Sequence, residues 1–135
     1  MSLHTPDFMQ GSRILVVEDD FLIALDLEER LHKLGCDVVG PFERLDKALA
    51  AVDNELHGAI VDINLRGQYS FELIDRLREE GVPTIVCSGY ASISDVQDKL
   101  RDIPLLPKPC NPDELLKLME KNFVRSSQFR RSTTN

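Results

Sequence analysis

The sequence predicts a single α/β domain in which a doubly wound parallel sheet carries helices on both faces. Three observations support this prediction: five short apolar runs recur along the chain, longer amphipathic segments separate them, and two of the runs contain proline. Strands that alternate with helices favour a parallel sheet with right-handed crossovers.

The five apolar runs are expected to form the strands. The first, third and fourth are nearly continuous and rich in β-branched residues, which is typical of parallel strands covered on both faces. The second run contains Gly40-Pro41 and the fifth contains Pro104. Because proline cannot donate to a β-ladder, both should be edge strands, and the flavodoxin-like strand order 2-1-3-4-5 satisfies this condition. The runs extend over Arg13 to Val17, Asp37 to Phe42, Ala59 to Ile63, Thr84 to Cys87 and Ile103 to Leu106.

The amphipathic segments are expected to form five helices, which completes a (βα)5 pattern. The last one begins with Asn111-Pro112, a typical N-cap followed by proline at the first helical position. The segments extend over Phe21 to Leu34, Leu45 to Val52, Phe71 to Glu80, Ile93 to Arg101 and Pro112 to Val124.

Length and charge limit the domain organisation and the class of partner. A chain of 135 residues corresponds to about one domain, expected over residues 13–124, with an N-terminal arm over 1–12 and a polar, basic tail over 125–135. The net charge of −7 argues against DNA binding and against an anionic membrane surface. No apolar stretch is long enough to span a membrane and no signal peptide is evident, so a cytoplasmic location is expected.

The three cysteines, Cys36, Cys87 and Cys110, are odd in number and far apart in the sequence. This spacing argues against a disulfide framework and against a zinc site. Two of them follow or lie within apolar runs, so they are interpreted as small core residues in a reducing compartment.

Polar side chains that carry chemistry gather at the predicted strand ends. Glu18-Asp19-Asp20 follows the first strand, Asp62 lies near the end of the third, Ser88-Gly89 follows the fourth and Lys108-Pro109 follows the fifth. In an open parallel sheet, ligands bind outside the carboxyl ends of the strands. The sequence therefore predicts that these groups meet at one edge.

This combination suits phosphoryl chemistry that depends on Mg²⁺. Neighbouring carboxylates repel one another unless a cation intervenes, and Mg²⁺ typically takes one or two carboxylates together with phosphate oxygens. Asp62 would supply the nucleophile, while Lys108 and Ser88 would neutralise or hydrogen-bond phosphoryl oxygens. Each group also has a purely structural alternative. Glu18 to Asp20 could be a loop that caps a helix, Ser88 could be an N-cap, and Lys108 could be an ordinary surface residue. The prediction therefore depends on all of them together.

At these residues the chain resembles the response-regulator receiver family of two-component signalling, over roughly residues 13–124. The resemblance implies a domain that signals and catalyses only its own phosphorylation and dephosphorylation, rather than an enzyme acting on other substrates. The matching segments are Ile14 to Asp20, Ala59 to Leu65, Ile85 to Gly89 and Leu106 to Pro109.

The resemblance also implies a role for each matching residue. Asp62 would accept the phosphoryl group from a partner's phosphohistidine, and Asp19, Asp62 and the backbone carbonyl of Asn64 would bind Mg²⁺ directly. Glu18 would act on the metal through water. Lys108 would pair first with Asp62 and then with the phosphoryl group, towards which Ser88 would move, and Lys108-Pro109 should be a cis peptide.

One residue departs from the usual family pattern, and three motifs resemble those of a particular subgroup. Leu105 stands where the family usually has an aromatic switch residue, so the loop from Gly89 to Ser94 and the following helix are expected to carry the conformational change. The motifs at Gly40-Pro41, Leu65-Arg66-Gly67 and Ser88-Gly89-Tyr90 resemble those of the subgroup paired with HWE-type histidine kinases.

The expected upstream partner is a sensor histidine kinase or a histidine phosphotransfer protein. If the chain is complete, its output is a contact with a downstream protein or a phosphorelay, and a homodimer is left open. Leu22, Leu25 and Phe21 lie off the core face of the first predicted helix, and we expect them to form part of the surface that docks the histidine-bearing partner. Scattered surface apolar residues are the alternative.

Two other functions were weighed. A haloacid-dehalogenase-like Mg²⁺ phosphohydrolase also uses an aspartyl nucleophile, but it needs a second aspartate at the position of Asn64 and a nucleophile on the first strand. A pseudo-receiver that only binds partners would not need the complete set of site residues.

Overall fold

The computed structural model describes residues 9–89, 100 and 102–133, with side chains as far as Phe123, and shows a five-stranded parallel sheet. The order β2-β1-β3-β6-β7 is the predicted order 2-1-3-4-5, so the predicted fold is confirmed. The edge positions of the two proline-containing strands are confirmed as well. The strands are β1 Arg13–Val17, β2 Asp37–Phe42, β3 Gly58–Asp62, β6 Thr84–Ser88 and β7 Leu105–Pro107.

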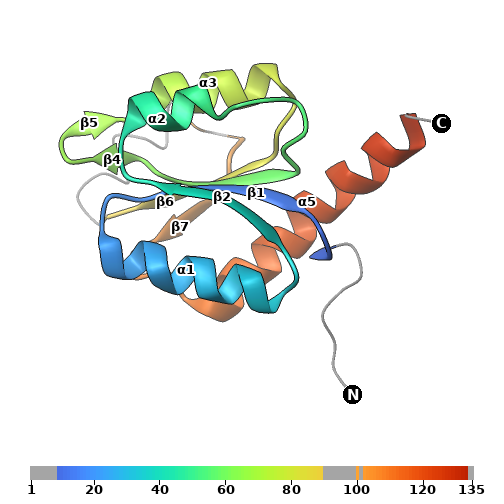
Figure 1. Cartoon of the computed structure of the whole chain (residues 1–135), viewed down its shortest axis with the longest axis horizontal. Coiled ribbons are helices and arrows are strands. Elements are labelled where there is room, and N and C mark those ends of the chain that lie inside the picture. The colour runs from blue at the N-terminus through green and yellow to red at the C-terminus, as the bar shows by residue number, and fades with distance from the viewer. Residues whose placement is uncertain (1–8, 90–99, 101, 134–135) are drawn as a thin grey trace.

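Helices cover both faces of the sheet (Figure 1). The helices α1 Phe21–Lys33 and α5 Pro112–Thr133 lie against one face, and α2 Leu45–Ala50 and α3 Phe71–Glu79 lie against the other. The helix expected from Ile93 to Arg101 falls outside the described residues except for Leu100, which is buried.

Side-chain caps fix where two of the helices begin. Asn111 Oδ1 accepts hydrogen bonds from the amides of Asp113 at 2.9 Å and Glu114 at 3.1 Å, which confirms the predicted N-cap of α5. Asp20 caps α1 in the same way, with two backbone amides at 3.0 and 3.2 Å. Each cap satisfies amides that have no partner within the helix.

The helix α5 continues past Val124, where its end was expected, as far as Thr133. The apolar periodicity stops at Phe123, which is the last residue seen to be buried in the core. Loss of apolar periodicity after Phe123 therefore does not mark the end of the helix. No glycine or proline interrupts residues 124–133, so the backbone can remain helical. Figure 1 shows this last part of α5 projecting past the sheet.

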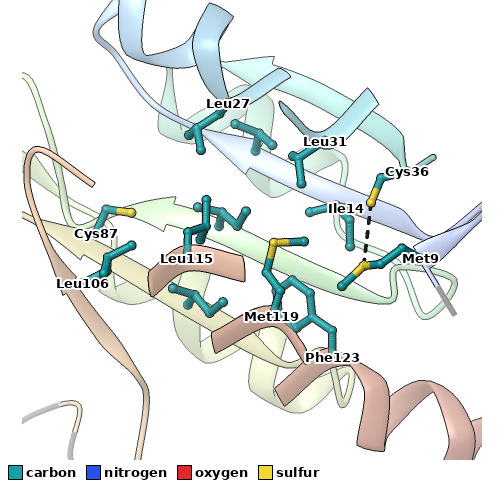
Figure 2. Packing of buried hydrophobic residues seen from close by; sticks show 13 residues of the cluster. Met9, Ile14, Leu27, Leu31, Cys36, Cys87, Leu106, Leu115, Met119 and Phe123 are labelled. Carbon is teal, nitrogen blue, oxygen red and sulfur yellow. Dashed lines mark hydrogen bonds between the residues drawn. The ribbon is translucent and has the colours of Figure 1, made fainter. Parts of the chain in front are cut away.

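The largest core cluster lies between the sheet and the pair α1 and α5 (Figure 2). Leu27 and Leu31 come from α1, and Leu115, Met119 and Phe123 come from α5. Burial of each such side chain stabilises the fold by roughly 1.5–3 kcal/mol. The strands contribute Ile14, Val16, Ile60, Ile85, Cys87 and Leu106.

Two further features fix this side of the core. A Cβ atom on Gly58 would lie 2.7 Å from the ring of Phe123, so α5 packs directly on the backbone of β3 at that point. Met9, in the segment expected to be an arm, is fully buried, and its sulfur lies 3.9 Å from that of Cys36. The chain therefore packs against the domain from Met9 onwards.

The opposite face carries two smaller clusters. One joins β1 and β3 to α2 and α3 through residues such as Leu15, Val61 and Leu73. The other, Ile63, Ile74, Val86 and Leu100, lies near the carboxyl ends of β3 and β6 and contacts the half-buried Leu105. Both faces of the central strands are thus covered, as their continuous apolar sequence predicted.

A short hairpin that the sequence analysis did not anticipate follows β3. Its strands are β4 Asn64–Leu65 and β5 Gln68–Tyr69, joined by Arg66 and Gly67. Both joining residues have positive φ, 54° and 90°, as a two-residue type I′ turn requires. Strands of two residues are too short to produce an alternating pattern in the sequence.

The peptide bond Lys108-Pro109 is cis, as predicted, and Gly40-Pro41 is also cis. Within the described ranges, we find no helix with the length and apolar character needed to span a membrane.

Candidate functional site

Three carboxylates meet where β1 and β3 end. Asp62 is the last residue of β3, and Glu18 and Asp19 directly follow β1. The two strands are neighbours with Val17 opposite Val61, so Glu18 and Asp62 lie side by side. Glu18 is 3% and Asp62 4% exposed, whereas Asp19 is partly exposed. Two buried acidic groups at one strand edge need a compensating positive charge.

Lys108 supplies a positive charge from the loop after β7. Its ammonium lies 2.6 Å from Asp62 Oδ2 and 2.8 and 3.0 Å from the two oxygens of Glu18. The backbone amide of Lys108 also donates to the carbonyl of Ser88 at 2.9 Å, which fixes the loop against the end of β6. The structure thus brings together residues separated by 46 and 90 positions in the sequence.

One ammonium shared by two buried carboxylates leaves the site short of positive charge. Burial raises the pKa of Glu18 to about 7, although Lys108 and the amide of Asp20 lower it and Asp62 adds repulsion. Burial also acts to lower the pKa of Lys108, but its contacts with Asp62 and Glu18 outweigh burial and raise that pKa. A further cation at this edge would relieve the deficit.

The predicted metal-binding carboxylates are close enough to share an ion. One oxygen from each of Glu18, Asp19 and Asp62 lies within 4.8 Å of the others. Hard oxygen donors at this separation fit a divalent cation such as Mg²⁺, with water completing its coordination shell. The donor set therefore agrees with the magnesium site expected from the sequence.

The loop after β3 orients Asp62. The amide of Asn64 donates to Asp62 Oδ1 at 3.2 Å, and the hydroxyl of Ser70 donates to the Asp62 carbonyl at 2.6 Å. Asn64 starts the hairpin, and its side chain accepts a hydrogen bond from Gly67 at 2.7 Å. Ser70 was not among the predicted site residues. Its place before α3 is typical of an N-cap, yet its hydroxyl makes no cap bond and instead holds the backbone of Asp62.

Ser88 ends β6 and is fully buried. Its hydroxyl donates to the carbonyl of Gly89 at 3.1 Å. Cys87, one residue earlier, is opposite Asp62 in the sheet, so Ser88 lies at the same strand edge as the acidic group. The position of Leu105 opposite Val86 places an aliphatic side chain where the family pattern usually has an aromatic one.

Two charged residues near the edge have other contacts. Asp20 caps α1, as the helix-capping alternative for Glu18 to Asp20 allowed, and it is not one of the three clustered carboxylates. Arg66, from the hairpin turn, lies 3.9 Å from Asp19 and 3.9 Å from Glu43. Its side chain is 68% exposed, so both ion pairs are weak.

Two cysteines that the sequence separates are close in space. The sulfurs of Cys87 and Cys110 are 3.2 Å apart, although neither is in a disulfide. Because strand order and not sequence distance decides which loop residues meet, spacing alone could not reveal this pair. Cys36 is buried elsewhere, next to Met9.

An exposed apolar surface borders the acidic edge at the start of α1. Phe21 and Leu22 are 74% and 73% exposed, and Leu25 is also exposed. Leu22 borders a pocket of about 210 Å³ between α1 and the start of α5. Phe21 and Leu25 border another of about 200 Å³, which reaches Pro41. The outward orientation predicted for these three residues is confirmed.

The arrangement suits attack by a carboxylate on phosphorus. The amide of Asn64 and the hydroxyl of Ser70 hold Asp62, and Lys108 contacts its carboxylate. The ammonium of Lys108, together with a divalent cation held by the clustered carboxylates, would neutralise the charge of an incoming phosphoryl group, which is most of what such a transfer needs from a protein.

Comparison with known proteins agrees with this geometry. The sequence profile of the response regulator receiver domain matches residues 14–120. A relative from Bacillus subtilis, the uncharacterized transcriptional regulatory protein YbdJ, is 29% identical over 114 residues, which make up 80% of this chain and 49% of the relative. The chain thus spans about half the length of the curated relatives it matches first.

Two solved structures match over nearly their whole length. SdrG from Sphingomonas melonis is 32% identical with a TM-score of 0.71, and the match covers 87% of this chain and 97% of SdrG. The signal receiver domain of a modulated diguanylate cyclase from Desulfovibrio desulfuricans is 27% identical with a TM-score of 0.76, covering 88% of this chain and 98% of that one.

Proposed function

The chain belongs to the response regulator receiver domain family, and from this premise we propose that it takes a phosphoryl group from a phosphohistidine onto Asp62 in a reaction that depends on Mg²⁺. The family is a signalling domain and not an enzyme of the usual kind. The observation that carries the proposal is the buried carboxylate pair of Glu18 and Asp62, with Asp19 beside it and Lys108 between them.

In the proposed step, a carboxylate oxygen of Asp62 forms a bond to phosphorus while the bond from phosphorus to the histidine nitrogen breaks. The bonding electron pair stays on the imidazole, so one phosphoryl group moves and nothing else is consumed. Asp19, Asp62 and the carbonyl of Asn64 would hold Mg²⁺ directly, and Glu18 would act on it through water. The bound ion would neutralise phosphoryl oxygens.

Lys108 and Ser88 are proposed to respond to the new group. In the structure the ammonium of Lys108 contacts Asp62 and Glu18, so phosphorylation of the Asp62 carboxylate would free it to follow the charge onto a phosphoryl oxygen. The hydroxyl of Ser88 bonds to the neighbouring carbonyl of Gly89 and would have to rotate to reach the phosphoryl group. Rotation of a hydroxyl needs only a change of side-chain rotamer.

The test is labelling of the intact chain with a small phosphodonor such as acetyl phosphate. Mass spectrometry should show one added phosphoryl group that requires Mg²⁺ and is absent in Asp62→Asn, because a neutral amide is a poor nucleophile. Asp20→Asn is a matched control, since Asp20 is an exposed cap, and it should be labelled normally. Acid-stable label on Asp62→Asn would overturn the assignment, and repeated turnover of a phosphomonoester would favour a phosphohydrolase.

The exposed apolar residues at the start of α1 are proposed to dock the histidine-bearing partner. Phe21, Leu22 and Leu25 flank the acidic edge and border two pockets that a partner helix could fill. Leu22→Ser and Leu25→Ser should slow phosphotransfer from a kinase and leave labelling by acetyl phosphate unchanged. Equal kinase rates for these variants and the parent chain would refute the docking role.

The motifs shared with the HWE-paired subgroup make a kinase of that type the proposed donor. With a donor of that type, the cytoplasm is the proposed location of the domain. We propose that the signal leaves by contact with a downstream protein or by further phosphotransfer. Phosphotransfer from purified candidate kinases, followed over time, would identify the donor.

A further inference from the structure

The pair Cys87 and Cys110 lies against the residues proposed to switch. Cys87 directly precedes Ser88 on β6, and Cys110 is two residues after Lys108. Their sulfurs are 3.2 Å apart. A disulfide has an S–S bond of about 2.05 Å, so the sulfurs need to approach by roughly 1 Å. Small rotations of the two side chains can bring the sulfurs together by this distance. Cys110 lies in a loop and is only half-buried, so its side chain has more room to rotate than that of Cys87.

The two thiols differ in access. Cys87 is 2% exposed and packs in the core with Leu106 and Leu115, as Figure 2 shows. Cys110 borders the pocket of about 210 Å³ between α1 and the start of α5, large enough to admit a small peroxide. An accessible thiol backed by a buried one at contact distance is the arrangement of an attacking and a resolving cysteine.

The charges around the pair favour attack by the accessible thiol. The hydrogen bond with Cys87 and the charge of Lys108 lower the pKa of Cys110, against an opposing contribution from burial. The contact with Cys110 and burial raise the pKa of Cys87. Thiolate is the reactive form of cysteine, so Cys110 is the more reactive of the two.

We propose that Cys87 and Cys110 are a redox modification site, which a hydroperoxide converts reversibly to an intramolecular disulfide. The Cys110 thiolate attacks the O–O bond, giving a sulfenic acid and releasing an alcohol, or water when the oxidant is hydrogen peroxide. The Cys87 sulfur then attacks the sulfenic sulfur and expels water. Two thiols lose two electrons and two protons, the peroxide bond takes up both electrons, and a dithiol reductant reverses the change.

Such a bond would tie together the two segments that carry the switch residues. At present the ends of β6 and β7 are joined there by the hydrogen bond from the Lys108 amide to the Ser88 carbonyl at 2.9 Å. A disulfide from Cys87 to Cys110 would add a covalent link beside it and restrain the loop that carries Lys108. This consequence rests on the proposed phosphorylation of Asp62: the oxidised domain should accept a phosphoryl group several-fold more slowly from acetyl phosphate.

The first experiment tests the bond itself and does not depend on phosphorylation. The full chain is treated with hydrogen peroxide, unfolded, alkylated with iodoacetamide and digested for mass spectrometry. A Cys87–Cys110 cross-linked peptide and a single alkylated thiol, Cys36, are expected. Cys36→Ala should form the same cross-link and leave no thiol to alkylate. Cys110→Ala and Cys87→Ala should both lose the cross-link, and the change at Cys110, which is only half-buried, is the milder substitution. Three free thiols, a disulfide only between chains, or oxidation of Cys110 that stops at the sulfinic acid would overturn the proposal.

The second experiment compares acetyl phosphate labelling of the reduced, oxidised and re-reduced chain. Labelling should be slower after oxidation and should return to the parent rate after treatment with dithiothreitol. Cys110→Ala should show no response to peroxide. An oxidised chain labelled at the parent rate would refute the restraint on Lys108. Absence of labelling in the reduced chain would instead count against the phosphoacceptor, while the cross-link result would still stand.

Discussion

Binding of Mg²⁺ to the acidic edge should depend on pH through Glu18. Burial raises the pKa of this carboxyl to about 7, so an ion that draws on its negative charge must displace a proton at lower pH. For one group with that pKa, the ionised fraction falls from about nine-tenths at pH 8 to about one-tenth at pH 6. The apparent affinity for Mg²⁺ should therefore weaken about tenfold over this range, or about 1.4 kcal/mol.

Isothermal titration calorimetry at pH 6, 7 and 8, in buffers of different ionisation enthalpy, measures both the affinity and the protons released. About half a proton should be released per Mg²⁺ at pH 7. Glu18→Gln should bind more weakly and release almost none, whereas Glu43→Gln, on an exposed residue outside the cluster, should match the parent chain. Equal affinity at pH 6 and pH 8, or proton release that survives in Glu18→Gln, would refute the reasoning.

The same carboxyl should make the metal-free fold less stable as pH rises. Between pH 4.5 and about 7, the folded chain holds a proton on Glu18 that the unfolded chain has lost. The unfolded state therefore binds fewer protons, and the free energy of unfolding falls with rising pH across this window. Thermal unfolding without Mg²⁺ should show lower stability as the pH rises across this window. Added Mg²⁺ should suppress this loss of stability.

Three other outcomes are expected. Lys108→Ala should still be labelled by acetyl phosphate, although more slowly, and should lose most of the chemical-shift change on phosphorylation, because the cation that links the phosphoryl group to the loop is gone; an intact response would contradict this role. Gly58→Ala should lower the free energy of unfolding, measured in urea, by about 1–3 kcal/mol, because the added methyl group would overlap the Phe123 ring. Gly89→Ala is the control and should not lower it through such overlap, because a methyl group there would meet open space. With beryllofluoride as a phosphate mimic, the amide shift and relaxation-dispersion changes should be largest over residues 88–101 and smaller at Leu105; change confined to the last strand would count against the proposed switch.

The sequence was sufficient to predict the sheet, because its signal is local. Buried parallel strands need continuous apolar runs, and Pro41 and Pro104 exclude their strands from central positions. With the order settled, the general rule for open sheets also places Glu18, Asp62 and Lys108 at one edge. Their roles in phosphoryl transfer remain predictions.

Three features of the structure could not be predicted, because they leave no local pattern in the sequence. The hairpin Asn64 to Tyr69 has strands too short for a periodic pattern, and α5 runs past Val124 because no glycine or proline interrupts the backbone over residues 124–133. Ser70 looked like an ordinary cap residue, yet its hydroxyl bonds to the Asp62 carbonyl, a contact that exists only once the hairpin has formed.

By itself, then, the sequence determined the α/β architecture and the chemical types gathered at the strand ends, because both depend on patterns within a few residues. The tertiary structure alone decided that one ammonium from Lys108 serves two buried carboxylates, that Asp20 turns away to cap α1, and that Cys87 and Cys110 touch. Each of these depends on the position and direction of side chains that come from separate strands, and close packing in the folded domain sets both.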